Sequence, residues 1–452
     1  MSLAKFYLIT DTHYFAQSLG ARGAEYDAFM RYEQKCFAET EAINKAVFAQ
    51  LAALQDADTV LIAGDLSFNG EKESHRDFLA LLGQLKAAGK RVFVVTADHD
   101  FKKPDGTCFA FDETGRLAPE KTLREELFDL YYEYGFKDAI AVDREHLSYV
   151  AQLAPGVRLL ALNNDANDRR CFDEAQRAWI LEQAAQAKAD SQMMFAMTHY
   201  PLLPGQPILS VIGSATQKDA AEVVPLLADA GVHLVFTGHM HNQSINEYVT
   251  PAGNKFYDVC TGAIIADPAV MRRVTIEDAD TVKIETVEIP DFEWDTGGRS
   301  CKQYLQDLFD QMIVHMLEDM ENDPGRVTRK LGLGENKKLY PIVRFFGKRI
   351  NRLTLGGFCR LVWIKCDPAI KKVKLKDFCK DLVRHAFEGN QPWVEGTPEG
   401  DTFLRFLRRF RFLLGKVKLK APDGSPADLF ELLKHSAGNY GIDDYNATLK
   451  LN

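Results

Sequence analysis

The residues best suited to chemistry in this sequence are aspartates and histidines that directly follow apolar segments. Five such segments end in them, and the residues are Asp11 and His13, Asp65, Asp98 with His99 and Asp100, His199, and His239 with His241. Ionisable groups at the end of a buried strand are costly to leave without partners. Mixed carboxylate and imidazole ligands suit Zn, Fe or Mn better than Ca or Mg. The sequence therefore predicts a transition-metal site at these strand ends.

The spacing of these residues favours two metal ions over one. Residues i and i+2 of an extended segment point the same way. Asp11 and His13 have this spacing and can both bind one ion, and the histidines at positions 239 and 241 can do likewise. Seven ligands are too many for one ion and fit two ions about 3.5–4 Å apart that share a carboxylate. A single histidine elsewhere is more often a core residue, and we interpret those at positions 75, 146, 233, 315, 385 and 435 in that way.

Predicted strands and helices alternate through residues 5–238. Apolar segments predict strands at 5–10, 59–64, 91–97, 157–163, 192–198 and 232–238. Helical periodicity predicts helices at 26–54, 71–88, 120–134, 173–188 and 218–230, with a loop-rich insertion at 101–119. From 243 to 289 the apolar period changes to two, which is typical of short strands. This order predicts a layered α/β core whose largely parallel strands bring their carboxyl ends to one edge.

The remaining third of the chain has a different composition. The turn-rich segment 289–298 suggests a boundary between a catalytic domain at 1–290 and a mainly α-helical basic cap domain at 298–452. Residues 326–420 hold 24 Lys and Arg against 8 Asp and Glu, whereas the rest of the chain is acidic. Helices are predicted at 300–320, 340–365, 376–388, 402–415 and 426–435. We expect them to pack their apolar faces on the catalytic domain, and we favour this over binding of nucleic acid or an anionic surface.

The cysteine pattern and the lengths of the apolar segments indicate the cellular compartment. The eight cysteines are scattered singly, without a C-x-x-C pair, which is typical of free thiols in a reducing compartment. No apolar run reaches the roughly 18 residues that cross a bilayer, and the opening residues lack a signal-peptide pattern. We therefore expect a cytoplasmic protein without a transmembrane segment, and the oligomeric state stays open.

The order of the strand-end motifs resembles the calcineurin-like metallophosphoesterase superfamily, whose pattern is D-x-H, G-D, G-N-H-[DE], H and G-H-x-H. This chain supplies Asp11 with His13, Gly64-Asp65, Ala97-Asp98-His99-Asp100, His199, and Gly238-His239-Met240-His241. Gln176 and Trp179 look most like the branch that holds bacterial cyclic-nucleotide phosphodiesterases. The resemblance implies an α/β fold, a two-layer mixed β-sheet sandwich flanked by helices. The helical part after residue 297 lies outside it.

The resemblance also implies a dinuclear centre of two divalent ions, or of one trivalent and one divalent ion, drawn from Mn, Fe and Zn. By position, Asp11, His13 and His241 would hold one ion. The other would bind Asp98, His199 and His239, and Asp65 would bridge. A metal-activated hydroxide would attack phosphorus. His99 would contact the phosphate or protonate the leaving oxygen, and Asp100 would orient its ring.

The implied function is hydrolysis of a small phosphoester, with phosphodiesters such as cyclic nucleotides favoured. The alternatives are a phosphomonoesterase, a nuclease assisted by the basic tail, or a non-catalytic metal-bound scaffold. The last alternative arises because the asparagine of the family pattern is Asp98 in this chain. An ionised aspartate offers only oxygen atoms, whereas asparagine also offers N–H groups.

Asp98 changes the charge of the implied centre. Three carboxylates and one hydroxide against two divalent ions sum to zero, where the family arrangement sums to +1. We hypothesise that Asp98 tightens metal binding and weakens the attraction for phosphate. A singly charged diester would suffer less than a doubly charged monoester, and a trivalent iron would restore the charge of +1.

Overall fold

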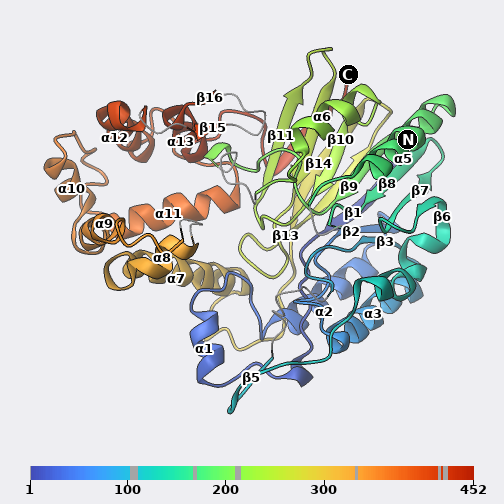
Figure 1. Ribbon diagram of the computed structural model, residues 1–452, viewed down its shortest axis with the longest axis horizontal. Coiled ribbons are helices and arrows are strands. Elements are labelled where there is room, and N and C mark those ends of the chain that lie inside the picture. The colour runs from blue at the N-terminus through green and yellow to red at the C-terminus, as the bar shows by residue number, and fades with distance from the viewer. Residues whose placement is uncertain are drawn as a thin grey trace.

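Two β-sheets packed face to face form the centre of the molecule, and helices cover their outer faces (Figure 1). The computed structural model describes residues 2–101, 110–165, 170–208, 215–330, 334–415, 419–420 and 426–452. The ring of Phe6 in the first sheet stacks on that of Phe195 in the second, with 5.3 Å between the ring centroids. The predicted fold class, a mixed two-layer sandwich flanked by helices, is confirmed.

The first sheet has six strands in the order β17-β14-β13-β1-β2-β3. Their bounds are β1 (Ala4–Ile9), β2 (Thr59–Ala63), β3 (Arg91–Val95), β13 (Val270–Ile276), β14 (Thr281–Glu288) and β17 (Asn446–Lys450). β1, β2 and β3 are parallel, and β13, β14 and β17 extend the sheet with antiparallel pairs. The parallel strands are apolar and mostly buried because both faces of the sheet are covered.

The second sheet has seven strands in the order β11-β12-β10-β9-β8-β7-β6. Their bounds are β6 (Ala139–Asp143), β7 (Ser148–Ala154), β8 (Val157–Leu162), β9 (Met193–Thr198), β10 (Leu234–Thr237), β11 (Ser244–Val249) and β12 (Lys255–Cys260). β8, β9, β10 and β12 are parallel to one another, and the other three strands are antiparallel to their neighbours. The carboxyl ends of the parallel strands in the two sheets carry the predicted ligands.

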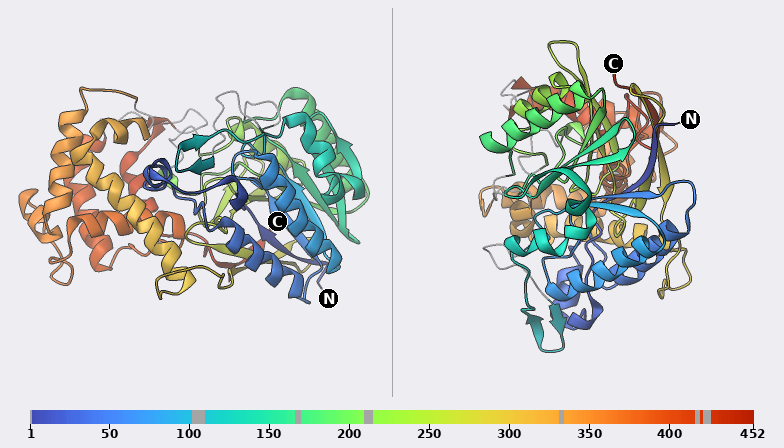
Figure 2. Two further views of the ribbon diagram at one scale, coloured as in Figure 1. Left: turned by 90° about the horizontal axis from the view of Figure 1, so that it is seen from below. Right: turned by 90° about the vertical axis from the view of Figure 1, so that its right-hand side faces the viewer.

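Two pairs of helices enclose this sandwich. α2 (Thr40–Ala53) and α3 (Lys72–Ala87) pack apolar side chains on the first sheet. α5 (Glu174–Ala189) and α6 (Ala220–Asp229) do the same on the second sheet. Figure 2 shows the two pairs on opposite sides of the sheets. The predicted helices at 71–88, 173–188 and 218–230 are thereby confirmed.

The predicted single helix at 26–54 is wrong. It is divided into α1 (Ala24–Met30) and α2, with an irregular segment at 31–39 between them. Phe37 in this segment is fully buried and packs against the rings of Phe15 and Phe68, at centroid distances of 4.0 and 4.5 Å. The backbone NH of Cys36 donates to the carbonyl of Ile265. Tertiary burial of Phe37 therefore overrides the local helical pattern.

Truncation of this buried ring is expected to destabilise the fold. Phe37→Ala should lower the free energy of unfolding by about 3–5 kcal/mol, as is usual for a fully buried phenylalanine. Urea denaturation followed by circular dichroism measures this change. Phe412→Ala is the matched control because the side chain of Phe412 is 63% exposed, and it should shift the free energy by less than about 0.5 kcal/mol. Equal effects of the two substitutions would contradict the packing that we describe.

Three shorter expectations also need correction. The described part of the loop-rich insertion holds a hairpin, β4 (Ala110–Asp112) and β5 (Gly115–Leu117). The predicted helix at 120–134 is a series of single turns, η2 (Arg124–Glu126), α4 (Leu127–Leu130) and η3 (Tyr132–Tyr134), followed by η4 (Phe136–Asp138); a further turn, η1 (Gln17–Leu19), precedes α1. The predicted helix at 340–365 breaks at Leu353 and Thr354, whose backbones are extended. The hydroxyl of Thr354 then accepts a hydrogen bond from Gly357 NH and starts a new helix.

The region after residue 298 is mainly helical, as predicted. Its helices are α7 (Cys301–Asn322), α8 (Pro324–Lys330), α9 (Tyr340–Arg352), α10 (Leu355–Leu361), α11 (Leu375–Glu388), α12 (Pro398–Leu414) and α13 (Leu429–Ala437), with a short pair β15 (Leu419–Lys420) and β16 (Pro426–Ala427). They lie to the left of the sheets in Figure 1. The chain then returns, and β17 pairs with β14 in the first sheet. The proposed boundary at 290–298 stays a prediction.

α11 joins this helical region to the loop that follows His241. The carbonyl of Phe387, near its end, accepts a hydrogen bond of 2.8 Å from the NH of Gln243. Within the residues that the structure describes, no helix is both long and apolar enough to cross a membrane.

Candidate metal centre

The structure brings the seven predicted ligands together in two adjoining groups. Each group has donor atoms that all lie within 4.8 Å of one another, and the groups are Asp11, His13 and His241, and Asp65, Asp98, His199 and His239. These residues follow β1, β2, β3, β9 and β10. The two sheets therefore meet at this edge as the strand-end rule anticipates. The roles of these residues as ligands stay predictions.

The backbone at these positions is strained. Five of the seven residues have positive φ: Asp11 (51°), His13 (37°), Asp65 (52°), His239 (65°) and His241 (51°). The described part of the chain has ten such non-glycine residues, so half of them lie in this one cluster. Positive φ costs a non-glycine residue about 1–3 kcal/mol and persists where the surroundings enforce it, typically at functional sites.

Asp65 lies between the two groups. Its Oδ2 is 3.1 Å from Nε2 of His199 in one group and 3.4 Å from Nε2 of His13 in the other. In the group of Asp11, His13 and His241, Nε2 of His241 is 3.2 Å from both Oδ1 of Asp11 and Nε2 of His13. Carboxylate oxygens and ring nitrogens thus converge on a shared centre, and Asp65 has the position of a bridging ligand.

The hydrogen bonds of His199 test whether metal ions fit this cluster. Its Nδ1 is 2.9 Å from the carbonyl of Ala63, an acceptor, so Nδ1 carries the proton. The Nε2 lone pair then faces the carboxylate of Asp65, and Nε2 has no hydrogen-bond partner among the described residues. Two electron-rich atoms 3.1 Å apart in a buried site need a cation between them. The donor set therefore fits bound metal ions.

The carboxylates and imidazoles shift one another's pKa. Burial raises the pKa of Asp11, but His241 and His13 outweigh burial and hold this pKa well below its usual range. Burial lowers the pKa of His199, but Asp65 and Asp11 outweigh it and raise this pKa to about 10, so a proton occupies the position between Nε2 and Asp65 whenever no metal ion does. The carboxylates are therefore held in their charged form, which attracts cations to the centre.

Asp100 has a different position from the one we expected. Its carboxylate accepts hydrogen bonds of 2.8 Å from the backbone NH groups of Ser67 and Ala97, so it joins the loops that follow β2 and β3. The ring of His99 is instead oriented by the carbonyl of Phe68, which is 2.6 Å from its Nδ1. The expectation that Asp100 orients this ring is therefore wrong. Asp100 instead links the main chain two residues after Asp65 to the main chain that directly precedes Asp98.

Lys35 is a residue near the site that the sequence analysis missed. Its side chain is 8% exposed, and its ammonium group lies 4.5 Å from the centroid of the Phe68 ring. That ring is in turn 5.9 Å from the ring of His13. Lys35 forms no ion pair with any residue in the described part of the chain. No signal in the sequence marks it, because it lies in the segment that we predicted as continuous helix.

Tyr200 is a second missed residue, although it directly follows His199. Its side chain is fully buried, and its ring centroid is 4.2 Å from that of His239. The guanidinium of Arg170 also lies over this ring, 4.9 Å from its centroid. Tyr200 therefore fixes the ring of His239 by packing.

Two of the histidines that we interpreted as core residues are confirmed in that role. His75 is buried, and its ring nitrogens are 2.6 Å from the hydroxyl of Tyr131 and 2.9 Å from the carbonyl of Asp100. His146 lies between the carboxylates of Asp143 and Asp173, at 2.6 and 3.0 Å. These partners account for both rings without a metal ion.

The ion pairs of His146 predict a pH-dependent contribution to stability. Burial lowers its pKa, but Asp143 and Asp173 outweigh this and raise the pKa above the usual histidine value of 6.5. Because the folded state holds the proton more tightly, the contribution is complete below the unfolded pKa and is lost as pH rises through the folded pKa. His146→Gln should therefore cost about 1 kcal/mol more at pH 5 than at pH 9. Urea titrations at both pH values measure this, and a constant difference would contradict it.

Comparison with known proteins gives the family. No curated protein matches the chain. Among solved structures, the chain is similar to a dimetal phosphatase from Danio rerio, with 14% identity, a TM-score of 0.45, and coverage of 64% of this chain and 98% of that one. It is also similar to a purple acid phosphatase from yellow lupin seeds, with 15% identity, a TM-score of 0.43, and coverage of 63% and 51%. The sequence profile of calcineurin-like phosphoesterases matches residues 4–243, more than half of the chain. The chain therefore belongs to the calcineurin-like phosphoesterase family.

Proposed function

We propose that this protein is a dinuclear metallohydrolase that prefers phosphodiesters to phosphomonoesters, with cyclic nucleotides as one candidate substrate. The observation that carries the proposal is the presence of Asp98 within the ligand cluster, beside His199 and His239. Its negative charge penalises a doubly charged monoester more than a singly charged diester. Family membership supports hydrolysis of a phosphoric ester.

The proposed ligand assignment follows from the two groups of donor atoms. Asp11, His13 and His241 would hold one ion, and the other four residues of the cluster would hold the second, with Asp65 contacting both groups of donor atoms. Mn, Fe and Zn suit this donor set, including a pair of one trivalent and one divalent ion. When bound, two such ions lower the pKa of water and offset the negative charge that develops on a phosphoryl group.

The residues of this chain that meet the substrate are His99 and Lys35 in our proposal. Nδ1 of His99 is hydrogen-bonded to the carbonyl of Phe68. Nε2 is therefore the ring nitrogen that would contact a phosphoryl or leaving-group oxygen. Lys35 adds one buried positive charge beside the Phe68 ring. That charge replaces the one that Asp98 removes from the centre, and it attracts the phosphate group.

Hydrolysis of paired chromogenic substrates tests this function. We expect the Mn²⁺-loaded protein to hydrolyse bis(p-nitrophenyl) phosphate with a higher kcat/KM than p-nitrophenyl phosphate. A higher kcat/KM for the monoester would overturn the diester preference and leave a phosphomonoesterase. A parent protein inactive on both substrates, on cyclic nucleotides and on nucleic acid, beside an active Asp98→Asn variant, would mean that Asp98 disables the site and that the protein is a binding scaffold.

The compartment is part of the proposal. The seven cysteines that the structure describes are free thiols, which supports a reducing environment and thus the cytoplasm. The positive charge of the helical region leaves nucleic acid as a candidate partner, which we favour less than a small phosphoester. Salt-dependent binding of single-stranded or double-stranded DNA would support the nuclease alternative.

A further inference from the structure

Large apolar side chains are exposed at the end of the helical region that lies farthest from the sheets (Figure 1). The side chain of Trp363, in the turn after α10, is 86% exposed. Six others on α9, α10 and α12 are 45–63% exposed, and they are Ile342, Phe345, Phe346, Leu361, Phe412 and Leu413. We call these seven side chains the apolar patch. Every exposed phenylalanine and tryptophan in the described part of the chain belongs to it.

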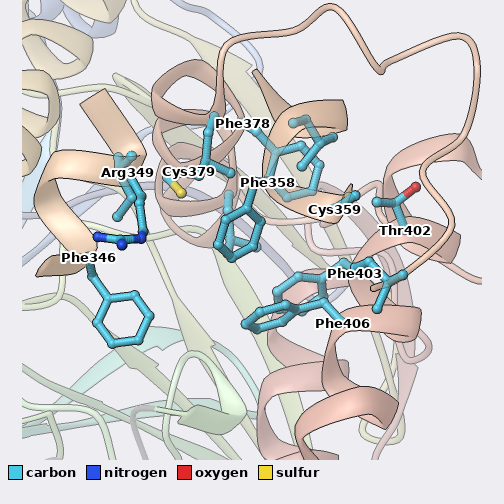
Figure 3. Close-up of a pocket in the computed structure, with 14 residues that line it drawn as sticks. Phe346, Arg349, Phe358, Cys359, Phe378, Cys379, Thr402, Phe403 and Phe406 are labelled. Carbon is cyan, nitrogen blue, oxygen red and sulfur yellow. The ribbon is translucent and has the colours of Figure 1, made fainter. Parts of the chain in front are cut away.

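The side chains of the apolar patch come from neighbouring parts of one surface. Phe346 on α9 and Phe406 on α12 line the same apolar pocket, and Figure 3 shows their rings across the pocket from each other. Nε of Arg409 on α12 donates a hydrogen bond of 3.3 Å to the carbonyl of Val362, which directly precedes Trp363. The two exposed residues of α12 lie three and four positions after this arginine, on the same side of the helix.

The fold does not need these side chains for its core. The inner faces of α10 to α13 pack on one another, and not on the catalytic domain as we expected from the sequence. Their shared core includes Leu355, Phe378, Trp393, Leu407 and Phe430, and it contains no described residue of either large sheet. The apolar patch lies outside this core. Contiguous exposed apolar side chains of this kind mark a surface that binds a partner.

The same surface is strongly basic. Residues 340–365 hold six Lys and Arg, residues 402–414 hold four, and neither segment contains Asp or Glu. Lys348, Arg360 and Lys365 are exposed and form no ion pair with a described residue. Rings and aliphatic side chains beside unpaired cations match an anionic lipid surface, where the apolar groups enter the boundary of head groups and acyl chains. Nucleic acid would attract the cations, but it offers exposed leucine and isoleucine side chains no apolar layer to enter.

We propose that the apolar patch and the cations around it dock this protein on a membrane surface that contains anionic phospholipid. Trp363 and Phe412, the most exposed members of the patch, enter the boundary between head groups and acyl chains. Lys348 and Lys365 lie beside lipid phosphates, and each such cation strengthens the attraction to the surface. This surface is separate from the metal centre, and the inference does not depend on the proposed function.

Sedimentation of the full chain with lipid vesicles tests the proposal. We expect binding to vesicles of equal parts phosphatidylserine and phosphatidylcholine, and about tenfold weaker binding or less to vesicles of phosphatidylcholine alone. Added salt should weaken the binding because it screens the cations. Tryptophan emission should shift to shorter wavelength on binding, and Trp363→Ala should abolish this shift, since the other three tryptophans are partly or fully buried.

Removal of two exposed rings tests the apolar contribution. Trp363→Ala combined with Phe412→Ala should weaken the affinity for the anionic vesicles by about tenfold or more, because less apolar area leaves water on binding. Ile140→Ala combined with Val249→Ala is the matched control. Both side chains are about half exposed, but they lie on the second sheet, so this control should leave the affinity unchanged.

Charge reversal tests the electrostatic contribution separately. Lys348→Glu should weaken the affinity for the anionic vesicles by about fivefold or more, because it replaces an attraction by a repulsion. Lys188→Glu, at an exposed position on α5, is the matched control and should leave this affinity unchanged. All of these positions are exposed, so the variants should keep the Tm of the parent.

Four outcomes would overturn the proposal. The first is absence of binding to the anionic vesicles, and the second is equal affinity of the patch variants and their controls. Binding of the parent to a DNA duplex without binding to vesicles would assign this surface to nucleic acid instead. A parent that sediments as a dimer, beside a monomeric Trp363→Ala variant, would assign it to a second copy of the chain.

Discussion

Asparagine in place of Asp65 is expected to abolish the phosphodiester hydrolysis that we propose, with a loss in kcat of about 10³-fold or more. Oδ2 of Asp65 lies 3.1 Å from His199 in one group of ligands and 3.4 Å from His13 in the other. No other carboxylate oxygen in the described residues is placed this closely against both groups. A bridging carboxylate contributes charge to both ions, and several kilocalories per mole of transition-state stabilisation depend on the pair.

Metal content gives this prediction a readout that is independent of activity. The parent protein should bind about two ions per chain when dialysed against Mn²⁺, and Asp65→Asn should bind about one or fewer, as measured by plasma emission spectroscopy. Asp138→Asn is the matched control because Asp138 is exposed and distant in sequence from every ligand. It should keep both the activity and the metal. Full occupancy together with full activity in Asp65→Asn would show that the centre does not use this carboxylate.

The candidate ligands could be predicted from the sequence because they depend on simple rules. Apolar segments locate buried strands, parallel strands end at one edge, and polar residues after them therefore meet. His199 directly follows its strand, and Asp11 and Asp65 follow theirs after one residue, so small errors in strand length do not displace them. The convergence of residues more than 200 positions apart then follows from topology alone.

Other parts of the site could not be predicted, because tertiary contacts decide them. Cys36 and Phe37 interrupt a helical pattern since their burial against distant elements outweighs local propensity, and Lys35 is carried to the site with them. The ring of His99 meets a main-chain carbonyl, which no sequence pattern encodes. β17 pairs with β14 although about 160 residues of chain separate the two strands. The strand propensity of the five residues in β17 does not specify which strand they pair with.

Removal of the Lys35 charge is expected to change substrate preference as well as rate. Lys35→Met should lower kcat/KM for the chromogenic phosphodiester by about 10- to 100-fold, mainly through KM, because a charged hydrogen bond contributes about 1.5–3 kcal/mol. The loss for the monoester should be larger, since that substrate carries twice the charge. Lys86→Met, at an exposed position on α3, is the matched control and should leave both rates unchanged.

Stability separates this role from a structural one. Lys35 is a buried cation without an ion pair in the described residues, so it costs free energy in the fold. Lys35→Met should therefore unfold at the same urea concentration as the parent or at a higher one. A residue kept for packing would lose stability and activity together.

The combination of Lys35→Met with Asp98→Asn tests the charge argument directly. Relative to the parent, the first substitution removes one positive charge near the substrate and the second removes one negative charge. The monoester-to-diester ratio of kcat/KM should therefore be highest in Asp98→Asn, lowest in Lys35→Met, and similar in the parent and the double variant. Changes in metal chemistry affect both substrates and largely cancel in this ratio.

Calorimetric measurements of the affinity for inorganic phosphate should give the same order among the four proteins. A ratio that does not respond to Lys35 in either background would mean that this lysine does not act on the phosphate, and that Asp98 alone sets the preference.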